Sequence, residues 1–125
     1  MSDSNKKILI VDDDKFLREM YVTKFSKTGF DVEGVGSVQE ALDKLEAGYK
    51  PNVLLFDIVM PVKGGWELMQ EIKGNDYIPK AKKIVLSNQG ESSDIEKSKE
   101  FDVDGYIVKA LNTPSEVVDE VKKII

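Results

Sequence analysis

Short runs of apolar, mostly β-branched residues recur along the chain and alternate with longer amphipathic stretches. The runs are Ile8 to Val11, Val32 to Val35, Val53 to Phe56, Ile84 to Leu86 and Tyr106 to Val108. The third and fourth lack a clear period-two alternation, which is typical of strands that helices bury on both faces. Strands that alternate with helices form a parallel sheet. The pattern therefore predicts an α/β fold with a five-stranded parallel sheet.

The stretch after the first run predicts a helix from Lys15 to Lys27. We expect Phe16, Met20 and Phe25 to be among its apolar contacts. Gly29 stands just past its end, where glycine commonly terminates a helix because it tolerates a positive φ. The first run and this stretch together form the first strand and helix of the α/β pattern.

Two later helices carry clear start signals. Ser37 with Glu40 and Thr113 with Glu116 have the spacing of a capping box, in which the first side chain and the glutamate satisfy backbone N–H groups reciprocally. Pro114 strengthens the second signal, since proline suits the first helical position. The second and fifth helices are therefore expected to begin at these sites.

The remaining two helices differ in how many apolar side chains they can bury. Gly65 precedes an apolar stretch that predicts a third helix packed on the sheet. A fourth helix, near Ser92 to Glu100, is mostly polar and offers little besides Ile95 to bury. A helix with so few apolar contacts is expected to be the most mobile of the five.

Length, composition and charge narrow the class of protein. With 125 residues, one domain over 1–125 is expected, with 1–6 as a frayed tail. The absence of cysteine and histidine excludes thiolate catalysis, imidazole bases and the usual zinc sites. A net charge of −5 argues against direct nucleic-acid binding. The apolar runs are too short to span a membrane and no signal peptide is evident, so a cytoplasmic location is expected.

Polar side chains follow four of the predicted strands at the point where each strand ends: Asp12 and Asp13, then Asp57, Ser87 and Lys109. In a flavodoxin-like sheet of strand order 2-1-3-4-5, ligands bind at the switch point between strands one and three. The three aspartates would meet there, and crowded carboxylates repel one another unless a cation is bound. An open site with few carboxylate oxygens favours Mg²⁺ or Mn²⁺.

Taken singly, each of these residues has an ordinary explanation. An aspartate at a strand end is often a turn former or a helix cap, and we assign Asp14 that role. Ser87 alone would be a loop hydroxyl and Lys109 alone a solvated lysine. Together, however, metal-binding carboxylates, a nucleophilic carboxylate, a hydroxyl and a cation are the parts that move a phosphoryl group by positioning and charge neutralisation.

These residues stand in motifs that resemble the receiver domains of two-component response regulators, over about residues 6 to 125. The motifs are Ile-Leu-Ile-Val-Asp-Asp-Asp at 8–14, Leu-Leu-Phe-Asp-Ile-Val-Met-Pro at 54–61 with Gly65, Val-Leu-Ser at 85–87, and Asp-Gly-Tyr-Ile-Val-Lys at 104–109. The resemblance implies a (βα)₅ fold. It also implies magnesium-dependent phosphotransfer from a histidine kinase or a phosphotransfer protein.

The resemblance also implies a role for each site residue. Asp57 would be the phosphoacceptor, and Asp13 a direct ligand of the metal. Asp12 would bind the metal mainly through water, and Val59 through its backbone carbonyl. Lys109 would pair with Asp57 at rest and with the phosphoryl group afterwards.

A switch is implied at two further positions. Ser87 would bind a phosphoryl oxygen, and the aromatic ring of Tyr106 would fill the space that Ser87 leaves. The fourth helix, fifth strand and fifth helix would then form the surface that an output protein or domain contacts. The sequence names neither that partner nor the kinase.

Four positions depart from the usual pattern of such domains or vary within it. Ala110 replaces the proline that normally follows the lysine, and a trans peptide is favoured there with Lys109 still reaching Asp57. Asn88 stands where alanine or glycine is usual and would narrow phosphate access. Val59 and Gln89 border the pocket and would tune the attack of water on the phosphorylated site.

Other classes of protein share parts of this pattern. A haloacid-dehalogenase-like phosphatase also uses an aspartate nucleophile, but it needs a second aspartate two residues on, where this chain has Val59. A flavin-binding module would need a hydroxyl-rich loop after the first strand, which is absent. A receiver that only mediates interactions, without phosphorylation, is the remaining alternative.

Overall fold

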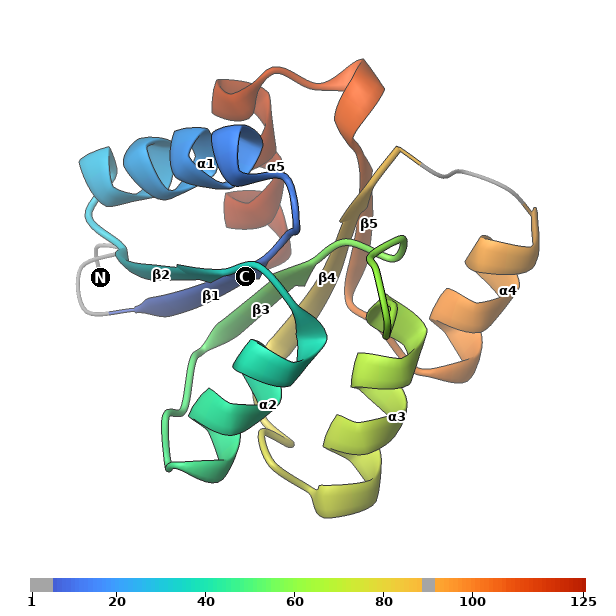
Figure 1. Ribbon diagram of the computed structural model, residues 1–125. Helices are drawn as coiled ribbons and strands as arrows, with labels where there is room; N and C mark the ends of the chain where they lie inside the picture. Colours follow the sequence, from blue (N-terminus) through green and yellow to red (C-terminus); the bar gives the residue numbers. More distant parts are fainter. Residues whose placement is uncertain (1–5, 89–91) are drawn as a thin grey trace.

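Five parallel strands lie side by side in the order β2-β1-β3-β4-β5 in the computed structural model, which describes residues 6–88 and 92–125 (Figure 1). The strands are β1 (Lys7–Val11), β2 (Asp31–Val35), β3 (Val53–Phe56), β4 (Lys82–Ser87) and β5 (Gly105–Val108). The predicted strands and the flavodoxin-like order are confirmed. Residues 1–5 of the expected frayed tail and Gln89 lie outside the described residues.

Helices cover both faces of this sheet (Figure 1). They are α1 (Lys15–Lys27), α2 (Val38–Glu46), α3 (Gly65–Asn75), α4 (Ser92–Glu100) and α5 (Pro114–Ile124), with the short 3₁₀ helix η1 (Lys109–Leu111) before α5. Helices α1 and α5 pack on one face, and α2 and α3 on the other, with α4 beyond α3. The predicted bounds of the first and fourth helices agree with the structure.

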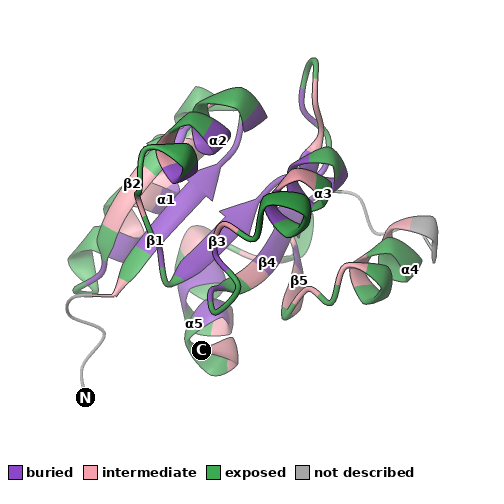
Figure 2. Ribbon diagram, turned by 90° about the horizontal axis from the view of Figure 1, so that it is seen from below, coloured by how far each residue is buried: buried purple, intermediate pink, exposed green. Residues whose placement is uncertain are grey.

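The core has two halves separated by the sheet, and successive strand residues alternate between them. In β3, Val53 and Leu55 join the half under α1 and α5, whereas Leu54 and Phe56 join the half under α2 and α3. All four side chains are buried, as Figure 2 shows for the central strands. This burial on both faces explains why the third run lacks polar alternation.

The sequence placed one side chain of α1 wrongly. Phe16 is 73% exposed, whereas Tyr21 and Phe25 are buried against the sheet. Position 16 lies about half a turn around the helix from Phe25, because each residue advances an α-helix by about 100°. Met20 is only partly buried and does not join either half of the core, so of the three expected residues only Phe25 is buried against the sheet.

Capping explains most of the observed helix ends. The Thr113 hydroxyl accepts from Glu116 N–H, and the Glu116 carboxylate accepts from Thr113 N–H, which confirms the predicted capping box. Ser37 accepts from Glu40 N–H, but the Glu40 carboxylate accepts from the N–H of Gly36 instead. The predicted capping box of Ser37 and Glu40 is therefore only half formed.

Helix α4 contributes little to the core. Among its described side chains, residues 94–100, none is buried, and Ile95 is 44% exposed. Ile95, the main apolar side chain that the sequence offered for burial in this helix, therefore points largely to solvent. No helix in the described part of the chain is both long and apolar enough to cross a membrane.

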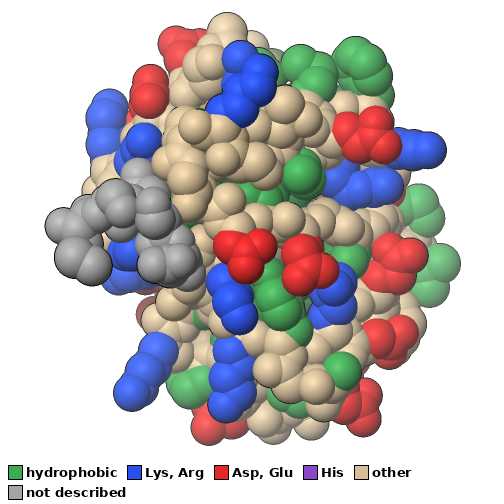
Figure 3. All heavy atoms as spheres, turned by 90° about the vertical axis from the view of Figure 1, so that its left-hand side faces the viewer, with side chains coloured by type: hydrophobic (Ala, Val, Ile, Leu, Met, Phe, Trp, Pro, Cys, Tyr) green, Lys and Arg blue, Asp and Glu red, His purple; other side chains and the backbone are tan. Residues whose placement is uncertain are grey.

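Charge is distributed evenly on the face shown in Figure 3. Lysine and arginine side chains of the described residues are interspersed there with aspartate and glutamate side chains. Nucleic-acid-binding surfaces gather basic residues into a patch or stripe. This face does not have that arrangement.

Candidate functional site

Asp12 lies at the end of β1 and is almost completely buried, with 1% of its surface exposed. Its Oδ1 accepts a hydrogen bond from Asp14 N–H at 3.0 Å, and its backbone carbonyl accepts one from the Arg18 guanidinium at 2.7 Å. Burial raises the pKa of the Asp12 carboxyl, although hydrogen bonds from Lys109 and Asp14 act in the opposite direction. Both the backbone and the side chain of Asp12 are therefore held in place.

Asp57 directly follows β3 and is 8% exposed. Its N–H donates to Val11 O at 2.9 Å, which extends the pairing of β3 with β1, and its Oδ1 accepts from Val59 N–H at 3.2 Å. Its other oxygen, Oδ2, faces Lys109. The carboxylate is therefore oriented by one backbone donor and one ammonium group.

The start of α3 packs tightly against the backbone around Asp57. The N–H of Gly65 donates to Ile58 O at 2.8 Å. A Cβ atom at position 65 would lie 2.4 Å from Asp57 O and 2.8 Å from the Phe56 ring. Only glycine fits here, which explains why the motif after β3 contains Gly65 and supports its interpretation as a residue that shapes the loop.

Lys109 reaches the same site from the end of β5, and its side chain is 7% exposed. Its Nζ lies 2.6 Å from Asp12 Oδ2 and 2.8 Å from Asp57 Oδ2. Burial alone lowers the pKa of this ammonium, but the hydrogen bonds to the two carboxylates outweigh burial and raise the pKa above 10.5. Lys109 therefore stays charged at neutral pH.

Three carboxylates converge at this end of the sheet. Ligand atoms of Asp12, Asp13 and Asp57 all lie within 4.8 Å of one another, and Asp13 is exposed to solvent while the other two are buried. Hard oxygen ligands, one of them facing water, fit a small divalent cation such as Mg²⁺ that keeps part of its hydration shell. Asp14 stands apart, since its Oδ1 caps α1 by accepting from Leu17 N–H at 3.1 Å, as predicted.

Ser87 and Tyr106 lie on the adjacent strands β4 and β5. Ser87 ends β4 and is 1% exposed, and Tyr106 is partly buried against the core beneath α2 and α3. The strand register pairs Ser87 with Val108 and Val85 with Tyr106. A buried hydroxyl and a half-buried aromatic ring thus occupy neighbouring strands beside Asp57 and Lys109.

Three of the positions that depart from the usual pattern, Ala110, Asn88 and Val59, lie in the described part of the chain. The Lys109–Ala110 peptide is trans, as favoured from the sequence, since the described residues contain no cis peptide bond. The chain then forms η1, and Asn112 donates to Val108 O at 2.9 Å. Asn88 and Val59 are exposed, and Val59 has 58% of its surface accessible.

Two partners of Asp12 were missed by the sequence reasoning. It paired Lys109 with Asp57 alone, and it gave Arg18 no role. The sequence did contain a signal for Arg18, namely the glycines at positions 34 and 36. A Cβ atom at Gly34 would lie 3.0 Å from Arg18 Cγ, so glycine leaves room for the arginine side chain. The contact between Lys109 and Asp12 joins residues 97 positions apart and had no such signal.

Comparison with known proteins identifies the family. The family model described as the response regulator receiver domain matches residues 8–122. The chain belongs to the response regulator receiver domain family. It is 34% identical over 120 residues to the chemotaxis protein CheY of Thermotoga maritima, covering 95% of this chain and 97% of that protein. A CheY-like receiver domain protein of Methanospirillum hungatei JF-1 superposes with a TM-score of 0.86 at 31% identity, over 96% of this chain and 93% of that chain.

Other relatives of this receiver domain are longer proteins. The chain is 30% identical to the probable transcriptional regulator ycf27 of Cyanophora paradoxa, covering 100% of this chain but 50% of that regulator. The chain thus spans about half the length of several curated relatives and nearly all of others. Receiver domains act in two-component signalling, where they interact with histidine kinases or phosphotransfer proteins and with output domains. The family match decides against the haloacid-dehalogenase-like phosphatase and the flavin-binding module.

Proposed function

We propose that Asp57 is the phosphoacceptor of this receiver domain and that the chain relays a signal by gaining and losing a phosphoryl group there. The single observation that supports this most strongly is the convergence of Asp12, Asp13, Asp57 and Lys109 at one end of the sheet. Two acidic side chains and a cation surround one oriented carboxylate. That arrangement suits the attack of a carboxylate on an anionic donor.

In the reaction, a carboxylate oxygen of Asp57 attacks the phosphorus of a phosphohistidine or of a small phosphodonor. The new O–P bond forms as the bond to the donor breaks, and the leaving group departs with the electron pair. The product is an acyl phosphate, which water later cleaves. Val59 N–H, which donates to Asp57 Oδ1, helps to fix the direction from which the carboxylate attacks.

A magnesium ion would be held by Asp13 directly, by Asp12 mainly through water, by Asp57, and by the backbone carbonyl of Val59. When bound, it supplies the positive charge that offsets repulsion between the Asp57 carboxylate and the incoming phosphoryl oxygens. The exposed Asp13 provides the side of the site that opens to solvent. Mn²⁺ has the same preference for oxygen ligands and would serve as a substitute.

Lys109 supplies a fixed positive charge beside the acceptor. Because its ammonium already lies 2.8 Å from Asp57 Oδ2, it can pass from the carboxylate to a phosphoryl oxygen with little movement. Its second contact, with Asp12, anchors it while it does so. Preorganised charge of this kind stabilises a transition state without a cost of reorganisation.

Ser87 and Tyr106 would transmit the change. A phosphoryl group on Asp57 offers strong acceptor oxygens, which draw the Ser87 hydroxyl toward them. The Tyr106 ring, on the neighbouring strand, then moves into the vacated space. The surface of α4, β5 and α5 would change shape for an output protein or domain in the cytoplasm, and a histidine kinase or phosphotransfer protein would be the donor.

Mass spectrometry after incubation with acetyl phosphate and Mg²⁺ tests the proposal. The wild type should gain one phosphoryl group that hydroxylamine removes, and Asp57→Asn should gain none. Asp14→Asn is the matched control, because asparagine caps a helix as well as aspartate and Asp14 lies outside the carboxylate cluster. A hydroxylamine-labile adduct that persists in Asp57→Asn would refute the assignment.

A further inference from the structure

Trp66 joins helix α4 to the rest of the domain. Its indole Nε1–H donates to Asp94 Oδ1 at 3.4 Å, and its ring stacks on Phe101 with centroids 5.8 Å apart and planes 9° apart. Asp94 lies in the first turn of α4, and Phe101 directly follows its last residue. One buried side chain of α3 therefore contacts both ends of α4. This matters because none of the described α4 side chains is itself buried.

The other contacts of Trp66 lead to the phosphoacceptor segment. Its ring meets Phe56 edge to face at a centroid distance of 6.2 Å, and Phe56 immediately precedes Asp57. The preceding residue, Gly65, is hydrogen-bonded to Ile58 O at 2.8 Å. Trp66 is thus fixed to the segment that carries Asp57, whereas α4 follows β4 and its terminal Ser87 in the chain.

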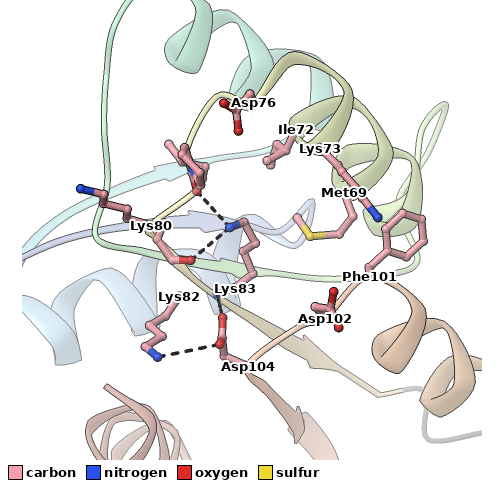
Figure 4. Close-up of a pocket in the computed structure, with 13 residues that line it drawn as sticks. Met69, Ile72, Lys73, Asp76, Lys80, Lys82, Lys83, Phe101, Asp102 and Asp104 are labelled. Carbon is pink, nitrogen blue, oxygen red and sulfur yellow. Dashed lines mark hydrogen bonds and ion pairs between the residues drawn. The ribbon is translucent and has the colours of Figure 1, made fainter.

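Phe101 has space beside it. It lines a cavity of about 370 Å³ between the end of α3, the start of β4 and the turn after α4 (Figure 4). Met69 and Ile72 form an apolar wall of the cavity, and Lys83 crosses it to donate hydrogen bonds to the carbonyls of Ile78 and Ala81. In a close-packed interior an aromatic ring moves only where a neighbouring space accepts it. The cavity provides that space for Phe101.

We propose that Trp66 is a positioning residue that holds α4 in its unphosphorylated position, and that its contact with Asp94 is lost on activation. The proposal rests on the assignment of Asp57 and Ser87 above. The two ends of this contact belong to two parts that the reaction would move relative to each other, since Trp66 is fixed beside Asp57 and α4 follows Ser87 in the chain. A contact that favours one of two states shifts the equilibrium toward that state by its own free energy.

Removal of the Asp94 contact should therefore favour the activated state. A hydrogen bond worth about 1 kcal/mol corresponds to a change of about fivefold in an equilibrium constant. By reciprocity, a variant that lacks the contact should bind a phosphoryl analogue up to about fivefold more tightly. A merely structural role for Trp66 would lower stability without raising this affinity.

The test uses Asp94→Ala, with Glu96→Ala as a matched control on the same helix, because Glu96 is exposed and lies outside the Trp66 contacts. Trp66 is the only tryptophan, so its fluorescence reports on this site directly. Beryllofluoride with Mg²⁺ should change the emission of the wild type. The spectrum of free Asp94→Ala should already be shifted in the same direction, and its affinity for beryllofluoride should be two- to fivefold higher.

Amide exchange of α4 measured without any ligand separates this proposal from the assignment of Asp57. It should be faster in Asp94→Ala and in Trp66→Phe, which keeps an aromatic ring but removes the N–H donor, and unchanged in Glu96→Ala. Equal or weaker beryllofluoride binding by Asp94→Ala would overturn the regulatory role. Unchanged α4 exchange in both variants would overturn the attachment itself, whereas failure of the wild type to bind beryllofluoride would count against the proposed function.

Discussion

The ammonium group of Lys109 forms an ion pair with Asp12 that is as close as its contact with the proposed phosphoacceptor. The nitrogen lies 2.6 Å from Asp12 Oδ2, and the two side chains are 7% and 1% exposed. A buried carboxylate that loses a cationic partner at hydrogen-bond distance carries an uncompensated charge. The pair therefore has a structural role in addition to its part in the proposed chemistry.

Lys109→Met should lower the free energy of unfolding by about 3 kcal/mol at neutral pH, as breaking one partner of a buried ion pair does. Urea denaturation is the measurement. Lys82→Met is the control, because Lys82 is about half exposed and lies 3.9 Å from Asp104, so its loss should cost less than about 1 kcal/mol. Equal effects of the two substitutions would contradict the structural role of the buried pair.

Asp13→Asn should raise the melting temperature in metal-free buffer while it impairs phosphorylation. It removes one of three crowded negative charges, and it also removes the solvent-facing carboxylate of the proposed metal site. Mg²⁺ should stabilise the wild type by about 2.7 kcal/mol when its concentration is 100 times the dissociation constant.

Thermal melts with and without Mg²⁺ measure both effects. Asp14→Asn, outside the cluster, should keep the stabilisation by Mg²⁺, and Asp13→Asn should lose most of it. If Asp13→Asn instead melts at or below the wild-type temperature without metal, the three carboxylates do not repel one another as their distances suggest.

Substitution by alanine at the two glycines of α3 should change the stability of the domain in opposite directions. At Gly65 a Cβ atom would lie 2.4 Å from Asp57 O, so Gly65→Ala should destabilise the domain by more than about 2 kcal/mol and slow phosphorylation. At Gly74 the added Cβ would meet no atom within 4 Å beyond its chain neighbours and the backbone of its own helix, so Gly74→Ala should stabilise the domain by about 0.5 to 1 kcal/mol. Chemical denaturation of the two variants, with a phosphorylation time course, distinguishes a local clash from a general effect of alanine.

The cap of α5 should make a pH-dependent contribution. Backbone and side-chain hydrogen bonds at Thr113 lower the pKa of Glu116 below 4.5. A carboxylate with a lowered folded-state pKa stabilises the protein above its unfolded pKa, and this contribution is lost as the pH falls through the folded value. Glu116→Gln should lower stability at pH 7, because a neutral amide replaces the carboxylate that accepts from the backbone N–H of Thr113. The difference from the wild type should shrink below about pH 4 in urea titrations, and a difference that grows there would contradict the assignment.

The sequence predicted the elements well where one local rule decided them. The central strands β1, β3 and β4 were recognisable because helices bury both of their faces, and α5 because Thr113, Pro114 and Glu116 form a complete start signal. Phe16 was placed wrongly because the helix has several apolar positions, and their spacing alone did not show which of them faces the sheet. Tyr21, at a buried position of the same helix, was overlooked for that reason.

The site was predictable to the extent that it depends on strand ends. Asp12, Asp57 and Lys109 could be brought together from the strand order, because parallel strands place their carboxyl ends at one edge. The attachment of α4 by Trp66 could not be foreseen in this way. It depends on how a ring of α3 meets Asp94 and Phe101, which lie 28 and 35 positions further along the chain.

The alternation of β3 residues between the two halves of the core restricts how the gene for such a domain can change. If one codon were inserted into or deleted from β3 while the start of the strand stayed in register, the residues after the change would exchange faces and Asp57 would turn away from Asp12. Loops between elements can change length one residue at a time, but this strand cannot. The position of Asp57, the proposed phosphoacceptor, therefore depends on the number of residues in the strand as well as on its own chemistry.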